Sequence, residues 1–149
     1  MSLTSQYQTW RAGLQAAVNQ ALTGEVYNAA SQAILEAVQS EVYDEYAPKV
    51  YERRKDDGGL LDAENISFEL DAGEMQLTVR NEAPRETGNY DSGFVAEIVE
   101  SGKGYIWPPK GVGARPFHSV AEEKLIADGT ASRALAEGLL RQGYTVIFE

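Results

Sequence analysis

The chain has 149 residues and a mass of 16.3 kDa, which is the usual size of one compact domain. Its composition, 43% hydrophobic and 24% charged, is typical of a folded globular protein and excludes a disordered chain. The absence of cysteine excludes disulfide frameworks and thiol nucleophiles, and the single histidine, His118, excludes catalytic triads that need a histidine elsewhere. No apolar run approaches the roughly 20 residues of a membrane span, and residues 1–6 lack the features of a signal peptide, so we expect no membrane partner.

The charge is strongly acidic, with 13 basic and 23 acidic residues and a net of −10. Most of the excess lies in the first half of the chain, because residues 1–75 have a net of −8 and residues 76–149 a net of −2. Such a surface repels DNA phosphates unless its basic groups gather on one face. Nucleic-acid binding is therefore disfavoured as the main activity.

Two helices are expected at the N-terminus. In residues 3–22, apolar side chains recur at steps of three or four, which is the stripe of an amphipathic helix: Tyr7, Trp10, Leu14, Ala17 and Ala21. Thr23 and Gly24 are expected to interrupt this helix, with Thr23 capping the next one. The second helix carries an apolar face from Tyr27 to Val42 and is expected to stop near Pro48.

Residues 49–65 show no sustained period and are expected to form an extended loop. Strict alternation follows in residues 66–70 and 75–79, on either side of a Gly-containing turn, which predicts a β-hairpin with one buried face. Residues 81–93 are polar and are interpreted as a loop. Residues 94–100 are ambiguous between helix and strand, with a slight preference for helix, and the Gly- and Pro-rich residues 101–116 are a second extended loop.

The C-terminal part is expected to be a helical segment followed by a closing strand. Ser119 and Glu122 have the spacing of a capping box that opens a helix, and Thr130 can cap a second helical piece through Leu139 or Leu140. Gly143 fits the position just past a helix end, and residues 144–148 are expected to be a strand. The predicted fold class is α+β, in a single domain over residues 1–149.

No complete chemical motif is present, and the chain is not expected to be an enzyme or to hold a cofactor or metal. A lone histidine before a helix, flanked by Phe117 and Ser119, is more typical of packing or capping than of catalysis. The Gly102-Lys103-Gly104 segment lacks the rest of a phosphate loop. Glu41, Asp44 and Glu45 share one helix face, but a solvated acidic face is the better interpretation than a cation site.

Two features favour protein interfaces. Arg53, Arg54 and Lys55 form the one basic cluster, which is suited to an acidic protein surface such as another copy of the chain. Eight tyrosines and two tryptophans, among them Tyr105 and Trp107 in the second loop, are residue types enriched at interfaces.

One combination of motifs resembles a known family. Val99-Glu100-Ser101-Gly102 is followed, after a Gly-rich stretch, by Ala114-Arg115-Pro116-Phe117 and then directly by a helix. This order is similar to the siphophage tail-completion or minor tail component family, related to the neck proteins of lambda-like phages. Ala83-Pro84-Arg85-Glu86-Thr87-Gly88 resembles that family's AP-x-x-TG loop, although here it follows the hairpin instead of preceding it. The resemblance spans roughly residues 25–140.

The resemblance implies a structural virion protein, made in the host bacterial cytoplasm, that forms a ring at the head–tail neck. It implies a homo-oligomer, most simply a hexamer, next to connector, tail-terminator or tail-tube proteins, with DNA passing through and not bound specifically. The interface residues we expect are Arg53, Arg54, Tyr105, Trp107, Arg115 and Phe117. The acidic residues expected to face the channel are Glu36, Glu41 and Glu45. For Arg115-Pro116-Phe117, an anchor at the start of a helix within one subunit is an equal alternative.

Two other functions remain open. A small acidic inhibitor or immunity-type protein that blocks a basic enzyme fits the acidic first half. A small enzyme is the weakest alternative, and it would require a reaction that depends on His118.

Overall fold

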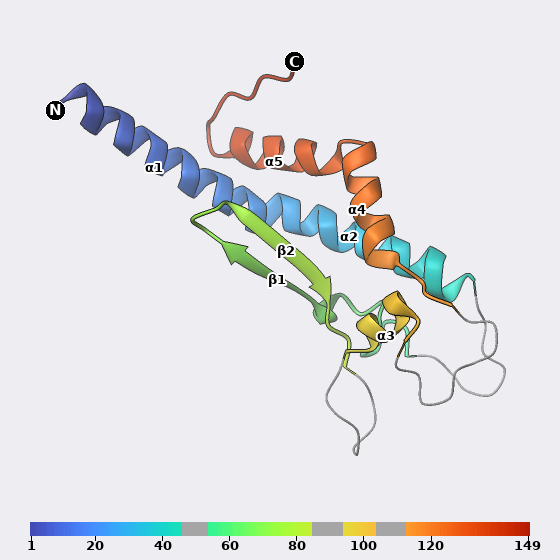
Figure 1. The fold of residues 1–149 in the computed structure, drawn as a ribbon. Coiled ribbons are helices and arrows are strands. Elements are labelled where there is room, and N and C mark those ends of the chain that lie inside the picture. Colours follow the sequence, from blue (N-terminus) through green and yellow to red (C-terminus); the bar gives the residue numbers. More distant parts are fainter. Residues whose placement is uncertain (46–53, 85–93, 104–112) are drawn as a thin grey trace.

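The computed structural model describes residues 1–45, 54–84, 94–103 and 113–149. Its main element is one unbroken helical rod over residues 3–43 (Figure 1). The rod consists of α1 (Leu3–Ala21), a π-helical turn η1 (Leu22–Val26), α2 (Tyr27–Val38) and a second π-helical turn η2 (Gln39–Tyr43). The predicted break at Thr23 and Gly24 is wrong. The Thr23 hydroxyl donates to the Asn19 carbonyl at 3.2 Å instead of capping a new helix, and the wider π-turn carries the chain through.

The predicted hairpin is confirmed as β1 (Ile66–Asp71) and β2 (Gln76–Asn81), which pair antiparallel with Phe68 opposite Val79. The predicted burial of its apolar face is wrong beyond Ile66, because Phe68 is 46% exposed and no layer of the described chain lies over the outer part of the hairpin. It follows a short 3₁₀ turn, η3 (Ala63–Asn65), and lies along the helical rod (Figure 1). Polar side chains of the rod hold it there. Gln15 and Asn19 donate side-chain amide hydrogens to the Ala72 carbonyl at 2.9 and 3.0 Å, and the Tyr27 hydroxyl donates to the Ile66 carbonyl at 2.8 Å.

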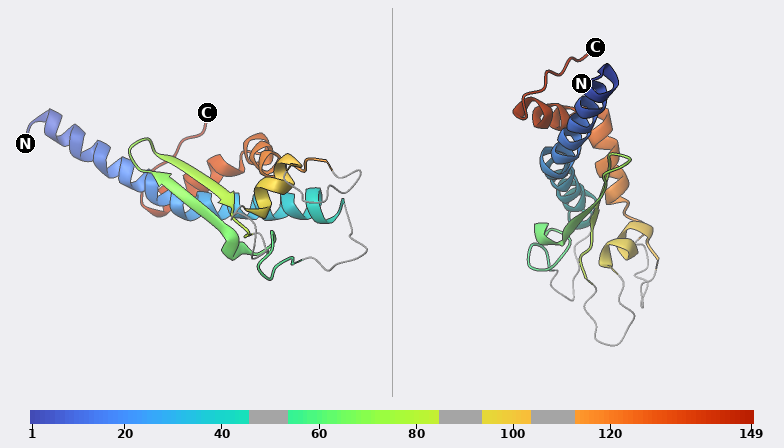
Figure 2. Two further views of the ribbon diagram at one scale, coloured as in Figure 1. Left: turned by 60° about the horizontal axis from the view of Figure 1, so that its bottom comes forward. Right: turned by 90° about the vertical axis from the view of Figure 1, so that its left-hand side faces the viewer.

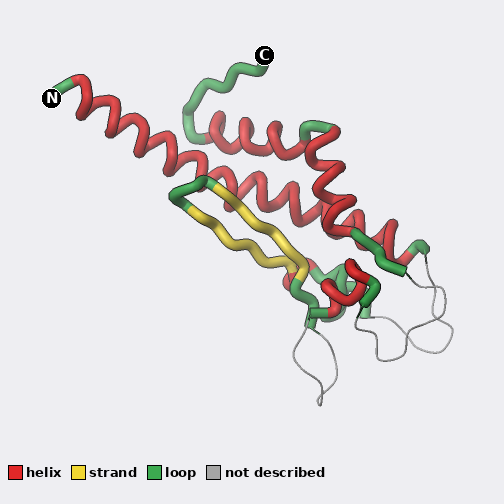
Figure 3. Tube along the Cα trace, viewed as in Figure 1, coloured by secondary structure: helices red, strands yellow, loops and turns green. Residues whose placement is uncertain are grey.

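Three shorter helices complete the fold: α3 (Val95–Ser101), α4 (Phe117–Ala127) and α5 (Thr130–Arg141). The helical preference for residues 94–100 is thus confirmed. Helix α4 packs against α2, and Gly129, at φ +69°, turns the chain so that α5 returns along α1 (Figures 1 and 2). The fold class is α+β, with helices far outweighing the two strands (Figure 3).

The predicted closing strand at residues 144–148 is wrong. Gly143 does end α5 with φ +90°, as expected, but the residues after it form no regular structure and pair with neither strand (Figure 3). Ile147 and Phe148 remain 82% and 65% exposed. The alternation of residues typical of a strand is present, but no strand of the hairpin is placed beside it to supply ladder hydrogen bonds.

The hydrophobic core lies where α2, the base of the hairpin, α3 and α4 meet. Phe117 and Val38 are its largest fully buried side chains. A second contact joins α1 and α5 through small residues, where Gly138 lies against Ala21, and the Gln142 side chain donates to the Ala17 carbonyl at 2.9 Å. No helix within the described ranges is long and apolar enough to cross a membrane.

The close approach at Gly138 gives a stability prediction. Replacing a helical glycine with alanine normally stabilises by about 0.5–1 kcal/mol. At Gly138 a Cβ would lie 2.5 Å from the Ala21 Cβ, so we expect Gly138→Ala to lower the free energy of unfolding by about 1–3 kcal/mol. Gly24, whose Cβ would meet nothing within 4 Å, is the matched control, and Gly24→Ala should stabilise. Urea unfolding measures both, and a stabilising Gly138→Ala would contradict the packing.

Candidate functional site

The two motifs of the sequence resemblance meet in one joint between α3 and α4. The Arg115 amide donates to the Val99 carbonyl at 2.9 Å. Gly102 ends α3 in a left-handed conformation, at φ +69°, and a Cβ there would lie 2.6 Å from the Ala114 backbone nitrogen. Only glycine satisfies both the backbone angle and the close approach, which explains why residue 102 is a glycine.

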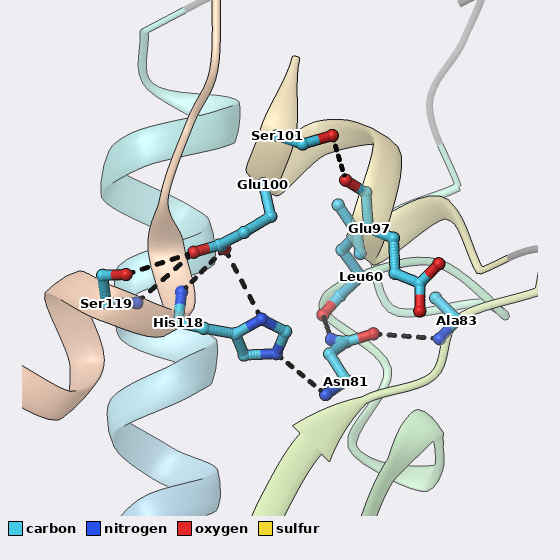
Figure 4. A network of polar contacts seen from close by, with 8 residues as sticks. All are labelled: Leu60, Asn81, Ala83, Glu97, Glu100, Ser101, His118 and Ser119. Carbon is cyan, nitrogen blue, oxygen red and sulfur yellow. Dashed lines mark hydrogen bonds and ion pairs between the residues drawn. The ribbon is translucent and has the colours of Figure 1, made fainter. Parts of the chain in front are cut away.

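Glu100 caps the start of α4 across this joint (Figure 4). Its carboxylate accepts hydrogen bonds from the His118 amide at 3.0 Å and from the Ser119 amide and hydroxyl, both at 3.5 Å. The predicted capping box is therefore wrong, because the helix begins two residues before Ser119 and its cap comes from α3. A negative charge at a helix N-terminus also interacts favourably with the helix dipole.

His118 connects the same joint to the hairpin (Figure 4). Its Nε2 accepts the Asn81 backbone N–H at 3.0 Å, and its Nδ1 lies 3.5 Å from the Glu100 carboxylate. Nε2 can accept only in the neutral ring. Burial lowers the pKa of His118 below its ordinary value, and the nearby Arg80 acts in the same direction while Glu100 opposes both.

Asn81 is the buried polar residue that completes the network, with 2% of its surface exposed. Its side-chain amide donates to the Leu60 carbonyl at 2.7 Å, and its side-chain oxygen accepts from the Ala83 amide at 3.0 Å. These bonds tie the residues before the hairpin to those after it. The sequence analysis did not single out Asn81, because an asparagine at a strand end carries no motif.

The arrangement holds α3, α4 and the hairpin together as a structural clamp. Both nitrogens of His118 face partners within the fold, the Asn81 amide at Nε2 and the Glu100 carboxylate near Nδ1. Across the described ranges, no group of three or more His, Asp or Glu side chains is placed to hold a metal ion.

The structure places the expected interface residues in different settings. Phe117 is fully buried and belongs to the core, which corrects its assignment to an interface. The Arg54 guanidinium donates to the Gly58 carbonyl at 3.0 Å and the Pro84 carbonyl at 2.8 Å, so it braces two segments of its own chain. Arg115 is half-buried in the joint. Three of the expected interface residues lie outside the described residues: Arg53, Tyr105 and Trp107.

The three acidic residues expected to face a channel also differ from one another. Glu36 forms an ion pair with Lys124 of α4, and that hydrogen bond holds the pKa of Glu36 below its ordinary value. Glu41 is half-buried and accepts from the Ser40 hydroxyl at 3.4 Å, whereas Glu45 is exposed. The negative charge of Glu36 is therefore balanced within the subunit.

Two apolar surfaces were not anticipated. The N-terminal half of α1 projects beyond the rest of the molecule (Figure 2), so that Tyr7 and Trp10 are 57% and 56% exposed, and only Ala17 and Ala21 of the predicted stripe are buried. An open groove of about 410 Å³ also lies between β2 and α4, with η1 and α2 as its floor. Periodicity identifies the apolar face of a helix, but it does not show how much of that face other elements of the fold cover.

Together these features define an α+β protein built on one long helix, with a helix-capping joint and two uncovered apolar surfaces. The YomN family model matches residues 7–141, and the chain belongs to the YomN family. That membership specifies no activity or partner. No curated protein and no solved structure matches the chain.

The burial of His118 predicts a pH dependence of stability. Since its folded pKa is below the unfolded value of about 6.5, the unfolded state binds more protons, and stability is lost as the pH falls below that value. We expect the free energy of unfolding to fall between about pH 7.5 and pH 5.5, above the range where carboxylates titrate. Urea titrations should show a smaller fall for His118→Gln, which does not titrate. Equal slopes in the two proteins would contradict this assignment.

Proposed function

We propose that this protein is a structural virion component of a tailed bacteriophage, which forms a ring at the head–tail neck through which DNA passes. The observation that supports this most is the joint itself. The two short motifs that resemble the tail-completion family are separated by a Gly-rich stretch in sequence, yet they are in contact through the Val99–Arg115 hydrogen bond and the Glu100 cap. Motifs that pack together are a stronger sign of a shared fold than motifs that match separately.

The surface of the molecule supports assembly as its role. A ring needs head-to-tail contacts that close by rotation. Such contacts need two different, complementary binding surfaces on each subunit. The projecting half of α1 and the groove beside β2 are two such surfaces. The proposed neighbours in the virion are connector, tail-terminator or tail-tube proteins.

The proposed passage of DNA rests on charge. A net charge of −10 repels phosphates and lets a genome pass without adhering. Because Lys124 balances Glu36, Glu41 and Glu45 are the stronger candidates for the channel face. The acidic surface is also the feature that would suit the alternative, an inhibitor that binds one basic enzyme.

Native mass and negative-stain images of the purified chain at micromolar concentration test the ring. We expect a closed ring of identical subunits, most simply six. If the chain instead stays monomeric and forms a tight one-to-one complex with a basic enzyme, the neck proposal is wrong and the inhibitor alternative holds. Mapping the protein in purified particles would check the location independently.

A further inference from the structure

The projecting part of α1 carries an apolar stripe that is mostly exposed, and only Leu14, at its inner end, is half-buried. We call residues 3–14 the arm. Leu3, Tyr7 and Trp10 are 83%, 57% and 56% exposed, and the rings of Tyr7 and Trp10 lie 6.1 Å apart on one side of the helix. The side chains that hydrogen-bond to the hairpin turn, Gln15 and Asn19, lie beyond the arm. Two adjacent aromatic rings on an exposed helix are typical anchors of a protein interface.

The groove beside β2 is the matching surface. Its floor is a stripe along η1 and α2, formed by Leu22, Val26, Ala30 and Ile34, and its walls are β2 and α4. Ala30 and Ile34 are buried at the bottom, whereas the wall residues Leu77 and Leu125 are half-exposed. A stripe of small and aliphatic side chains between two raised walls is the form in which proteins bind an amphipathic helix.

The arm and the groove agree in length. At 1.5 Å per helical residue, the stripe from Leu3 to Leu14 covers about 17 Å, and the floor from Leu22 to Ile34 covers about 18 Å. Three to four turns of helix can therefore lie along the floor without leaving either end uncovered.

Their charges are complementary as well. Arg11 is the only charged side chain in the first 24 residues of a chain with a net charge of −10. With helical spacing it lies one turn from Tyr7 and from Leu14, so it borders the apolar stripe. Glu122, exposed on α4, is the acidic side chain in the lining of the groove.

One chain cannot make this contact with itself. The arm and the floor of the groove belong to the same continuous rod, and the floor begins eight residues beyond the end of the arm (Figure 1). The arm would reach its own groove only if the helix broke and folded back. The occupant that fits is therefore the arm of another copy.

We propose that the arm of one subunit lies in the groove of a second copy, with Trp10 and Tyr7 against the floor and Arg11 beside Glu122. The two surfaces differ, so the contact is head-to-tail and each subunit both gives an arm and receives one. Only the closure of this contact into a ring rests on the proposed function. The contact itself stands on the two surfaces.

Disulfide trapping tests the contact directly, because the chain contains no cysteine. Arg11→Cys and Glu122→Cys proteins are mixed in equal amounts at about 100 µM and oxidised, and non-reducing gels measure the linked dimer. The matched control is Thr9→Cys mixed with Glu123→Cys, since exposed Thr9 lies on the far side of the helix from Arg11 and Glu123 is not part of the groove lining. We expect at least tenfold more linked dimer from the first pair. Equal yields from the two pairs, or no dimer from either, would overturn the proposal.

A second variant separates this inference from the ring. Trp10 is exposed, so Trp10→Ala should fold normally, yet it should weaken self-association by about 30-fold if Trp10 is an anchor. Gln8→Ala should leave self-association unchanged. Rings that persist unaltered in Trp10→Ala would overturn the arm–groove contact and leave the neck proposal standing. Loss of rings in Trp10→Ala but not in Gln8→Ala would support both.

Discussion

The continuity of the helix through residues 22–26 is the constraint on which the rest of this structure depends. Because the rod does not break there, one element holds the hairpin through Gln15 and Asn19, packs α5 against Ala21, and forms the floor of the groove. The same continuity carries Trp10 away from the body. A hinge at Thr23 would let the first helix pack back onto α2, and the arm would then be part of the core.

The joint between α3 and α4 gives the motifs a physical meaning. Phe117 is buried in the core, and Glu100 caps the start of α4, where Pro116 has no side-chain group that can accept a hydrogen bond. His118 joins the same joint to the end of β2 through its hydrogen bond with the Asn81 amide. The motif residues thus serve folding within the subunit. The surfaces on which the proposed assembly rests carry no motif, which is why the sequence motifs pointed to Phe117 and not to the arm.

Local patterns predicted the elements whose partners are close in sequence. The hairpin and the stop at Gly143 followed from alternation and glycine chemistry, and the helix at residues 95–101 was favoured slightly over a strand. Features set by distant residues were missed. The cap of α4 comes from Glu100, 17 residues before the helix begins, and residues 144–148 have the pattern of a strand without a neighbour to pair with. The sequence placed Tyr7 and Trp10 on the apolar stripe of a helix but could not show that they are exposed, because periodicity does not reveal how far the folded body extends along that helix.

A distance across the rod tests the central claim most directly. Spin labels at Gln8→Cys and Gln39→Cys, in a chain with no other cysteine, would be separated by 31 helical residues, or about 46 Å along the axis. Double electron–electron resonance, with labelled protein diluted in unlabelled protein to suppress contacts between copies, should give one narrow distribution near that value. A broad distribution, or one centred well below about 40 Å, would show that the helix bends or breaks near Thr23, and the arm would no longer be fixed away from its own groove.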